Sequence, residues 1–504
     1  MQKKKIAEHF KWLGIAFVIK LVLFVFFTIQ FNTNYPKEFI IKKTFIELGE
    51  TFTYYMPIES MADGKGYSMK AYNNKTHQFF YYPSTRRVPG IAPFYYPLLK
   101  LFDRDTAKVG VIVFQFLLSI LSVYLLALIA LSISQSQKIF LLTFFLYSVS
   151  SFVSIFDHYG ISESFSISFL IIGTYFSLYA LQTEKKHVYL IAGFFLCWST
   201  FVRPALGVAF AFAGVLFLVI HLRQKTFSFL SFCLKIVIFA TPLIISLCAW
   251  SARNYTVTKG EFIPLEDDIY KTQMYAYNPR IIAIRGLIGA WGGQIDRWTR
   301  NSMGEYFLAA NPNPSSIKAF APRMFNSQCN LDSIKQLRLD YMQSIDTTLP
   351  LEQLNIIGNK VIEKAERYTN TFKKEKPLQY YIVSPIALAG KFYYFTYLDY
   401  LPFPSLSEMK LYQKAIKIAY ILFFNFLLLS AVLGVITMLL KGSLEGKLLL
   451  LFPLFYTFVM IVIFIASEKR YIAPAYPFMV IYAGYFLGII WENRSKKISK
   501  KLSL

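Results

Sequence analysis

Runs of about 20 apolar residues recur along this chain, and they restrict its fold more than any other feature. A helix of that length crosses the roughly 30 Å of hydrocarbon in a bilayer. Of the 504 residues, 55% are hydrophobic, and the mean hydropathy of +0.42 is high for a soluble protein of this size. We therefore expect an all-α polytopic membrane protein with about ten transmembrane helices.

The expected spans are residues 10–31, 108–132, 138–156, 161–181, 187–202, 204–222, 228–250, 413–440, 446–466 and 471–491. The first run is too long for a secretory signal and has no small-residue cleavage site, so we expect it to remain as a span. Two readings stay open for residues 187–222, because Arg203-Pro204 can be a turn between two spans or a kink within one.

Long polar stretches between the spans divide the chain into three parts. Residues 1–250 are expected to form a first bundle that includes an outer loop, 32–107. Residues 251–412 then form an insert outside the membrane, and residues 413–504 form a closing transmembrane bundle with a basic tail. The chain has no internal repeat and no low-complexity linker.

The insert is expected to be mostly helical. Apolar residues recur at helical spacing within 331–347 and 350–373, and Pro377 follows the second stretch. The aromatic stretch 378–398 has few charges and is expected to lie along the membrane interface, where aromatic rings gather.

Lysine and arginine in the short loops predict the orientation, because cytoplasmic loops carry an excess of them. This rule places both termini in the cytoplasm and both long loops, 32–107 and 251–412, outside. The protein is then a multi-pass protein of the cytoplasmic (inner) membrane whose site faces outward. The basic inner residues are Lys3, Lys4, Lys5, Lys138, Lys185, Lys186, Arg223, Lys225, Lys441, Lys447, Arg494, Lys496, Lys497, Lys500 and Lys501.

Net charge, cysteine usage and histidine spacing argue against nucleic-acid binding, an internal disulfide framework and a zinc centre. The net charge of +24 fits inner-leaflet anchoring plus a basic outer face rather than nucleic-acid binding, because no soluble basic domain is present. Three of the four cysteines lie in apolar runs and only Cys329 lies in an outer loop, so no internal disulfide framework is expected. The sequence has no CxxC and no histidine-rich spacing, so a histidine-based zinc centre is not expected, and we expect no cofactor; whether a divalent metal assists stays open.

Ionisable residues gather at the outward ends of the spans. They belong to different loops, yet this topology puts them at one membrane face, and ionisable groups at membrane depth tend to line cavities or pathways. Any one of them alone can be an ordinary charged loop end. The candidates are Glu50, Arg87, Asp157, His158, Glu163, Arg203, Arg253, Glu468, Lys469 and Arg470.

Glu50 and Arg87 stand out within the first outer loop. Residues 50–62 have the pattern of an amphipathic helix with Gly64 beyond its end, so the helix dipole favours an anion at Glu50. That carboxylate can accept a proton from an attacking group, but it can also be a simple helix-start residue, and Glu47 is a rival. Arg87 precedes the turn Pro89-Gly90, and its fork suits a phosphate, on a ligand or on a lipid headgroup.

The order of these residues resembles the GT-C glycosyltransferases, most closely the branch with protein O-mannosyltransferases and lipid A aminoarabinose transferases. The similarity is scattered over residues 49–477, and each motif is weak by itself. The motifs that carry it are Gly49-Glu50, Tyr54, Gly64-x-Gly66-Tyr67, Arg87-x-Pro89-Gly90, Ser162-Glu163, Arg203-Pro204, Trp250-x-x-Arg253-Asn254 and Arg470-Tyr471-x-x-Pro474.

The resemblance implies a polyprenyl-phosphate-linked sugar as donor, a GT-C-like module of seven spans followed by variable spans, and inversion at the anomeric carbon without a metal. This chain departs from the family at three points. It has glutamate at position 50 where aspartate is usual, two residues before Pro93 where one is usual, and no Trp-Trp-Asp motif, which makes transfer of a whole oligosaccharide less expected.

Roles for the site residues follow from the resemblance. Glu50 is expected to be the base, with Asp157 or Glu163 orienting the acceptor or the sugar. The arginines are expected at the departing phosphate, whose charge grows in the transition state. The expected substrate-binding residues are Arg87, His158, Arg203, Arg253, Arg470 and Tyr471.

Two other functions remain open for such a sequence. One is a polysaccharide polymerase or ligase, which also has large outer loops. The other is a transporter of a lipid-linked glycan, favoured mainly by Lys20 near the middle of the first span. Transporters commonly show paired repeats, which this sequence lacks. The identities of the sugar, the acceptor and the polyprenol stay open.

Overall fold

The computed structural model describes residues 2–73, 77–224, 228–266, 278–293, 302–346, 348–393, 401–404, 406–465 and 469–502. The chain divides into two compact units. Unit 1 comprises Met1–Asp267, Thr396–Tyr456 and Ala473–Leu504. Unit 2 comprises Asp268–Phe395 and Thr457–Ile472, so most of the expected insert belongs to it.

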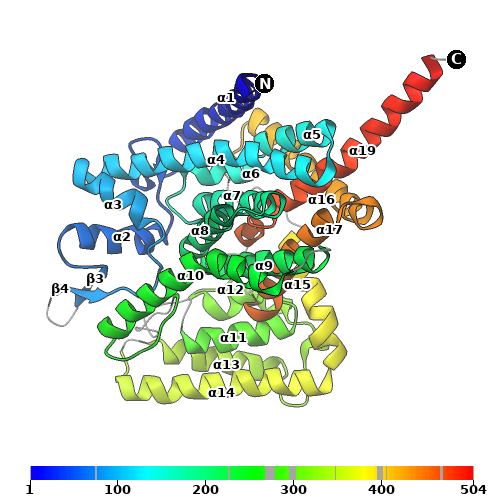
Figure 1. Ribbon diagram of the computed structural model, residues 1–504. Coiled ribbons are helices and arrows are strands. Elements are labelled where there is room, and N and C mark those ends of the chain that lie inside the picture. The colour runs from blue at the N-terminus through cyan, green and yellow to red at the C-terminus, as the bar shows by residue number, and fades with distance from the viewer. Residues whose placement is uncertain are drawn as a thin grey trace. The chain divides into compact units, whose positions relative to one another are not determined.

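Unit 1 is a helical bundle in which α7 packs between α4 and α8, while α8 also packs on α10 and α16 on α19 (Figure 1). Local signals begin and end these helices. Asp103, for example, accepts hydrogen bonds from the amides of Asp105 and Thr106 at the start of α4. The helices are α1 (Gln2–Asn34), α2 (Thr51–Ala62), α3 (Ala92–Leu101), α4 (Arg104–Ser134), α5 (Gln137–Ser148), α6 (Ser151–Ile155), α7 (Glu163–Thr183), α8 (Lys186–Val202), α9 (Gly207–Leu222), α10 (Phe229–Val257), α16 (Leu411–Lys441), α17 (Leu444–Leu449), α18 (Leu451–Phe458) and α19 (Tyr476–Leu502), with 3₁₀ turns η1 (Lys37–Phe39), η2 (Phe156–His158) and η3 (Pro204–Leu206).

The helices confirm the expected all-α polytopic membrane protein, although fewer of them qualify as spans than the sequence suggested. Seven helices in the described part of the chain are long and apolar enough to cross a membrane, and the bent pair Gln137–Ser148 and Ser151–His158 makes up to eight. The expected span 187–202 is a shorter apolar helix, α8. Arg203 separates α8 from α9 in an extended conformation, so residues 187–222 form two helices with a turn.

The first outer loop folds into a small α/β layer. The helix predicted at 50–62 is confirmed as α2, with Glu50 at its N-cap and Gly64 beyond its end at a φ of +76°. Two antiparallel pairs of strands accompany it. The pairs are β1 (Ile40–Ile41) with β2 (Phe45–Ile46), and β3 (Ser68–Asn73) with β4 (Gln78–Pro83), the latter in register from Ser68↔Pro83 to Asn73↔Gln78.

Unit 2 is helical in its described residues. The helices predicted at 331–347 and 350–373 are confirmed as α13 and α14, and the apolar face of α14 buries Val361 and Ala365 completely. Both helices pack with α11 into one hydrophobic core. The elements are α11 (Pro279–Ala290), α12 (Met303–Leu308), η4 (Pro314–Ala319), η5 (Pro322–Met324), α13 (Leu331–Ser344), α14 (Leu351–Glu375), the π turns η6 (Gln379–Val383) and η7 (Val459–Ile463), α15 (Ser384–Tyr393) and η8 (Lys469–Ile472).

Candidate functional site

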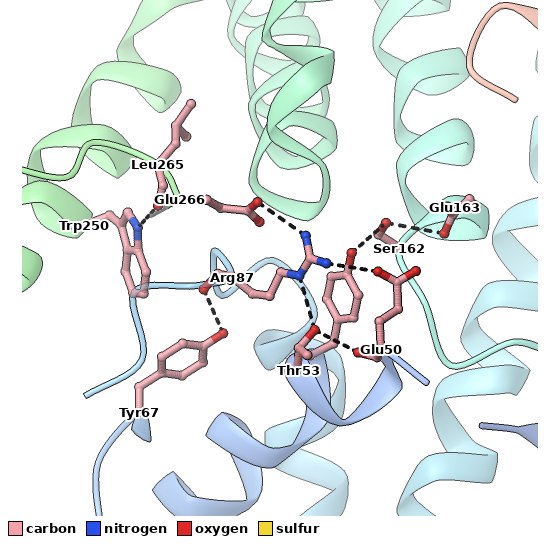
Figure 2. A network of polar contacts seen from close by, with 10 residues as sticks. Glu50, Thr53, Tyr67, Arg87, Ser162, Glu163, Trp250, Leu265 and Glu266 are labelled. Atoms are coloured by element: carbon pink, nitrogen blue, oxygen red, sulfur yellow. Dashed lines mark hydrogen bonds and ion pairs between the residues drawn. The ribbon is translucent and has the colours of Figure 1, made fainter. Parts of the chain in front are cut away.

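Arg87 is the centre of a charged cluster in unit 1. It lies on the loop between β4 and α3, and its Nη2 is 3.0 Å from Oε2 of Glu50 at the start of α2. Its Nε donates to Oγ1 of Thr53 at 3.2 Å, and its guanidinium lies over the ring of Tyr54, 4.5 Å from the centroid. The first turn of α2 therefore presents an acid, a hydroxyl and an aromatic face to one arginine, as Figure 2 shows for the first two.

A second carboxylate, Glu266, contacts the same arginine. Its Oε2 lies 3.4 Å from Nη1 of Arg87, so the guanidinium points between Glu50 and Glu266 (Figure 2). Glu266 follows α10, and the neighbouring carbonyl of Leu265 accepts a hydrogen bond of 2.7 Å from the indole of Trp250. Sequence analysis missed Glu266, because its segment carries several acidic residues and nothing in their order singles one out.

A second ion pair, between Glu163 and Arg203, connects to this cluster. Nη1 of Arg203 lies 2.8 Å from Oε1 of Glu163, and both side chains are almost fully buried. The hydroxyl of Tyr54 donates to Ser162 at 3.3 Å, and Ser162 donates to Glu163 at 3.4 Å. Burial raises the pKa of Tyr54 to about 12, against the opposing effect of Arg87, so its hydroxyl remains a donor at neutral pH.

Arg253 holds the base of the β3–β4 hairpin. Its Nη2 donates to the carbonyl of Tyr67 at 2.6 Å and its Nη1 to the carbonyl of Ser84 at 2.7 Å. These two residues directly precede β3 and follow β4. The hydroxyl of Tyr67 in turn donates to the carbonyl of Arg87 at 3.1 Å. Tyr67 therefore connects Arg253 to the backbone of Arg87.

Asp157 and His158 lie inside the helix bundle rather than at an exposed rim. Asp157 is 1% exposed, pairs with Nζ of Lys20 at 2.9 Å and accepts from Ser164 at 2.6 Å. The ring of His158 is fully buried and stacks on Phe24, with centroids 4.1 Å apart. The predicted order of spans and loops placed both residues at the outward ends of the spans, but η2 turns them toward α1. The pairing also gives Lys20, the residue that favoured a transporter, a partner within the bundle.

Arg470 and Tyr471 belong to unit 2, on the 3₁₀ turn η8, where the guanidinium lies 5.4 Å from the tyrosine ring centroid. Glu468 lies outside the described residues. Of the residues that the sequence singled out, the structure thus brings together Glu50, Arg87, Glu163 and Arg203, with Arg253 attached through the hairpin. Within the described ranges, no three His, Cys, Asp or Glu side chains are grouped so as to share a metal ion.

An apolar cavity of about 460 Å³ adjoins the cluster through two chain segments. One is the turn Pro89-Gly90, just after Arg87, and the other is the end of α10 at Trp250. The Gly90 carbonyl accepts from the indole of Trp198 at 2.9 Å, and a Cβ at Gly90 would lie 2.1 Å from the Phe201 carbonyl oxygen. Only glycine fits there. The cavity is lined by Pro89, Gly90, Pro93, Phe194, Cys197, Trp198, Phe201, Pro242, Ile245, Ser246, Ala249 and Trp250.

The fold and the membrane-length helices define a polytopic membrane protein with a GT-C-like fold. Among solved structures, the chain is similar to the archaeal oligosaccharyltransferase AglB from Archaeoglobus fulgidus, in complex with an inhibitory peptide and a dolichol-phosphate. The TM-score is 0.51 at 12% identity, over 99% of this chain and 52% of AglB. The chain thus spans about half the length of that protein, and the likeness concerns the fold. No family model matches the sequence, and no curated protein does.

Proposed function

We propose that this protein is an integral membrane glycosyltransferase that moves a sugar from a polyprenyl-phosphate donor to an acceptor outside the cytoplasmic membrane, with inversion. The observation that carries this proposal is the apolar cavity beside the Glu50–Arg87 pair. A lipid-phosphate donor has a long apolar chain and an anionic head, and this arrangement offers a surface for each. AglB, which shares the fold, binds a dolichol-phosphate.

In this proposal the cavity takes the prenyl chain and Arg87 contacts the phosphate. The turn Pro89-Gly90 lines the cavity and follows Arg87 in the sequence, so in this proposal the lipid follows that turn and its phosphate reaches the guanidinium. Arginine presents a fork of donors that suits phosphate oxygens. Arg253 supports the same site indirectly, by fixing the hairpin whose Tyr67 bonds the Arg87 carbonyl. Arg470 and Tyr471 stay candidates for the donor.

The chemistry needs a base at the acceptor more than an acid at the donor. The acceptor oxygen or nitrogen attacks the anomeric carbon, the bond from that carbon to the phosphate oxygen breaks, and the electron pair leaves with polyprenyl phosphate. Glu50 takes the proton of the acceptor. The Arg87 guanidinium 3.0 Å away holds the Glu50 carboxylate in place, and it also stabilises the growing phosphate charge.

Glu163 and Ser162 are placed to orient the acceptor or the sugar. They connect to Tyr54, whose ring lies beneath Arg87, and Arg203 neutralises Glu163 at 2.8 Å. An oriented acceptor lowers the entropic part of the barrier. Asp157 pairs with Lys20 and Ser164, and His158 contacts α1, so both residues suit support of this region.

The proposal is tested with the purified protein in nanodiscs. Native mass spectrometry should detect one bound decaprenyl phosphate, with weaker binding of decaprenol as the uncharged control. A panel of polyprenyl-phosphate sugars should then release polyprenyl phosphate in the presence of a membrane extract that contains acceptors. In parallel, envelope glycans and lipids from cells with and without the protein should differ by one sugar. Equal binding of decaprenol, or unchanged envelope glycans, would refute the proposed function.

A further inference from the structure

A buried turn, residues 156–162, delivers Ser162 and Glu163 to the charged cluster. It begins with η2 and ends at Ser162, the N-cap of α7. The Gly160 amide donates to the Ile46 carbonyl at 3.0 Å, which attaches the turn to the first outer loop. A Cβ at Gly160 would lie 2.2 Å from the ring of Phe45 and 2.8 Å from the methyl of Thr51, so the turn packs directly against the start of α2.

Three helices anchor this turn from the other side. Gln115 of α4 donates from Nε2 to the carbonyls of Phe156 and Tyr159, at 3.2 and 3.3 Å. Nε2 of His158 lies 3.0 Å from the Thr28 hydroxyl and 3.1 Å from the Phe24 carbonyl, both on α1. Ser164 on α7 donates to Asp157. The turn is thus held by neutral hydrogen bonds at several points and by charge at one.

That one charged anchor is the pair Lys20–Asp157. The two side chains are each 2% exposed, and their charged atoms are 2.9 Å apart. Lys20 also donates to Ser154 at 2.9 Å, on the helix that leads into the turn. A buried ion pair contributes little net stability compared with an apolar pair of the same shape, but removing one partner leaves a buried charge without compensation. Loss of Lys20 should therefore disturb the turn to which Asp157 belongs.

We propose that Lys20 and Asp157 are positioning residues, which fix the turn 156–162 so that Ser162 and Glu163 meet Tyr54 and Arg203 in the geometry required for transfer. The expected effect on catalysis rests on the proposed function, whereas the anchoring of the turn does not. Neither residue touches a substrate. The pair connects α1 with the turn that leads to Glu163, the acid proposed to orient the acceptor. Lys20 and Asp157 themselves are 137 positions apart in the sequence.

Three variants test the proposal by hydrogen exchange in nanodiscs. Lys20→Met removes the cation and keeps the length of the side chain. Lys20→Met combined with Asp157→Asn removes both charges and keeps a hydrogen-bonding group beside Ser164. Lys235→Met is the matched control, because Lys235 pairs with Glu184 next to the other end of α7. Lys20→Met should speed exchange in a peptide covering residues 156–166 by at least tenfold, and the double variant should restore most of the protection.

Kinetic measurements distinguish a positioning role of Lys20 from a role in global stability alone. Lys20→Met should lower kcat by at least tenfold with little change in the donor KM, and the double variant should recover at least half of that loss. Exchange that rises evenly over all peptides of unit 1, unchanged exchange in 156–166, or an unchanged kcat would each overturn the proposal. The Lys235→Met control should leave both readouts near wild type. A wild type without transferase activity would refute the proposed function, and the exchange data would then decide the anchoring alone.

Discussion

Replacing Glu50 by glutamine separates the two roles that its position allows, proton acceptor and partner of Arg87. The amide oxygen can still accept a hydrogen bond from Nη2 of Arg87, which is 3.0 Å from the native carboxylate, but the amide does not take a proton. The backbone carbonyl of residue 50 continues to accept from the Thr53 hydroxyl at 2.8 Å. The start of α2 should therefore keep its structure in Glu50→Gln.

The two roles predict losses of different size. The Glu50 and Arg87 side chains are 24% and 19% exposed, so weakening their ion pair should lower the free energy of unfolding by only about 1 kcal/mol or less. Loss of a general base should lower turnover by about 100-fold or more. That factor corresponds to about 2.7 kcal/mol in the activation free energy. If Glu50 is the base, the increase in activation free energy should therefore clearly exceed the loss in the free energy of unfolding.

The assay measures turnover in nanodiscs with the donor that the wild-type protein uses. Thermal unfolding and binding of decaprenyl phosphate are measured on the same samples. Glu47→Gln is the matched control, because Glu47 lies three residues upstream and pairs with Lys108 at 2.8 Å, away from Arg87. We expect the control to be mild and donor binding to survive in Glu50→Gln. Near-normal turnover of Glu50→Gln, or an equal loss in Glu47→Gln, would refute the assignment of Glu50 as base.

Three further predictions concern the donor site and the topology. Arg87→Ala should weaken binding of decaprenyl phosphate by about tenfold or more, since a hydrogen bond to a charged group contributes about 1.5–3 kcal/mol; an unchanged affinity would remove Arg87 from the phosphate. Gly90→Ala should destabilise the protein by about 1–3 kcal/mol, because its Cβ would meet the Phe201 carbonyl at 2.1 Å, and thermal unfolding checks this. A cysteine introduced at Asn330 should react with an impermeant reagent from outside and one at Ser499 should not; the reverse result would invert the topology.

Periodicity and order in the sequence were enough to predict the parts of the fold that depend on local signals. The apolar face of α14 and the glycine after α2 each predicted an element within a few residues of its bounds. The sequence also placed Glu50 and Arg87 in one outer loop, but the ion pair between them was not predicted from it. In each case a short stretch of chain carries the information.

The parts that could not be predicted depend on where distant segments meet. Counting loops placed Asp157 at the rim, whereas η2 turns it toward Lys20, and only the fold shows that 3₁₀ turn. The sequence singled out Lys20 as a lone lysine within an apolar span, but several acidic residues were available as its partner. The β3–β4 hairpin was missed because its aromatic run from Phe79 to Tyr82 does not alternate with polar residues.

The position of Arg87 between two carboxylates has a consequence for the proposed reaction. One guanidinium contacts both Glu50 and Glu266, so a donor phosphate that replaces a carboxylate avoids a third anion at Arg87. The contact with Glu266 is the longer, 3.4 Å against 3.0 Å, and Glu266 lies on the segment after α10 rather than at a helix start. We therefore expect Glu266 to give way. Arg87 then keeps its contact with Glu50 while it contacts the phosphate, so one cation positions the base and stabilises the leaving group.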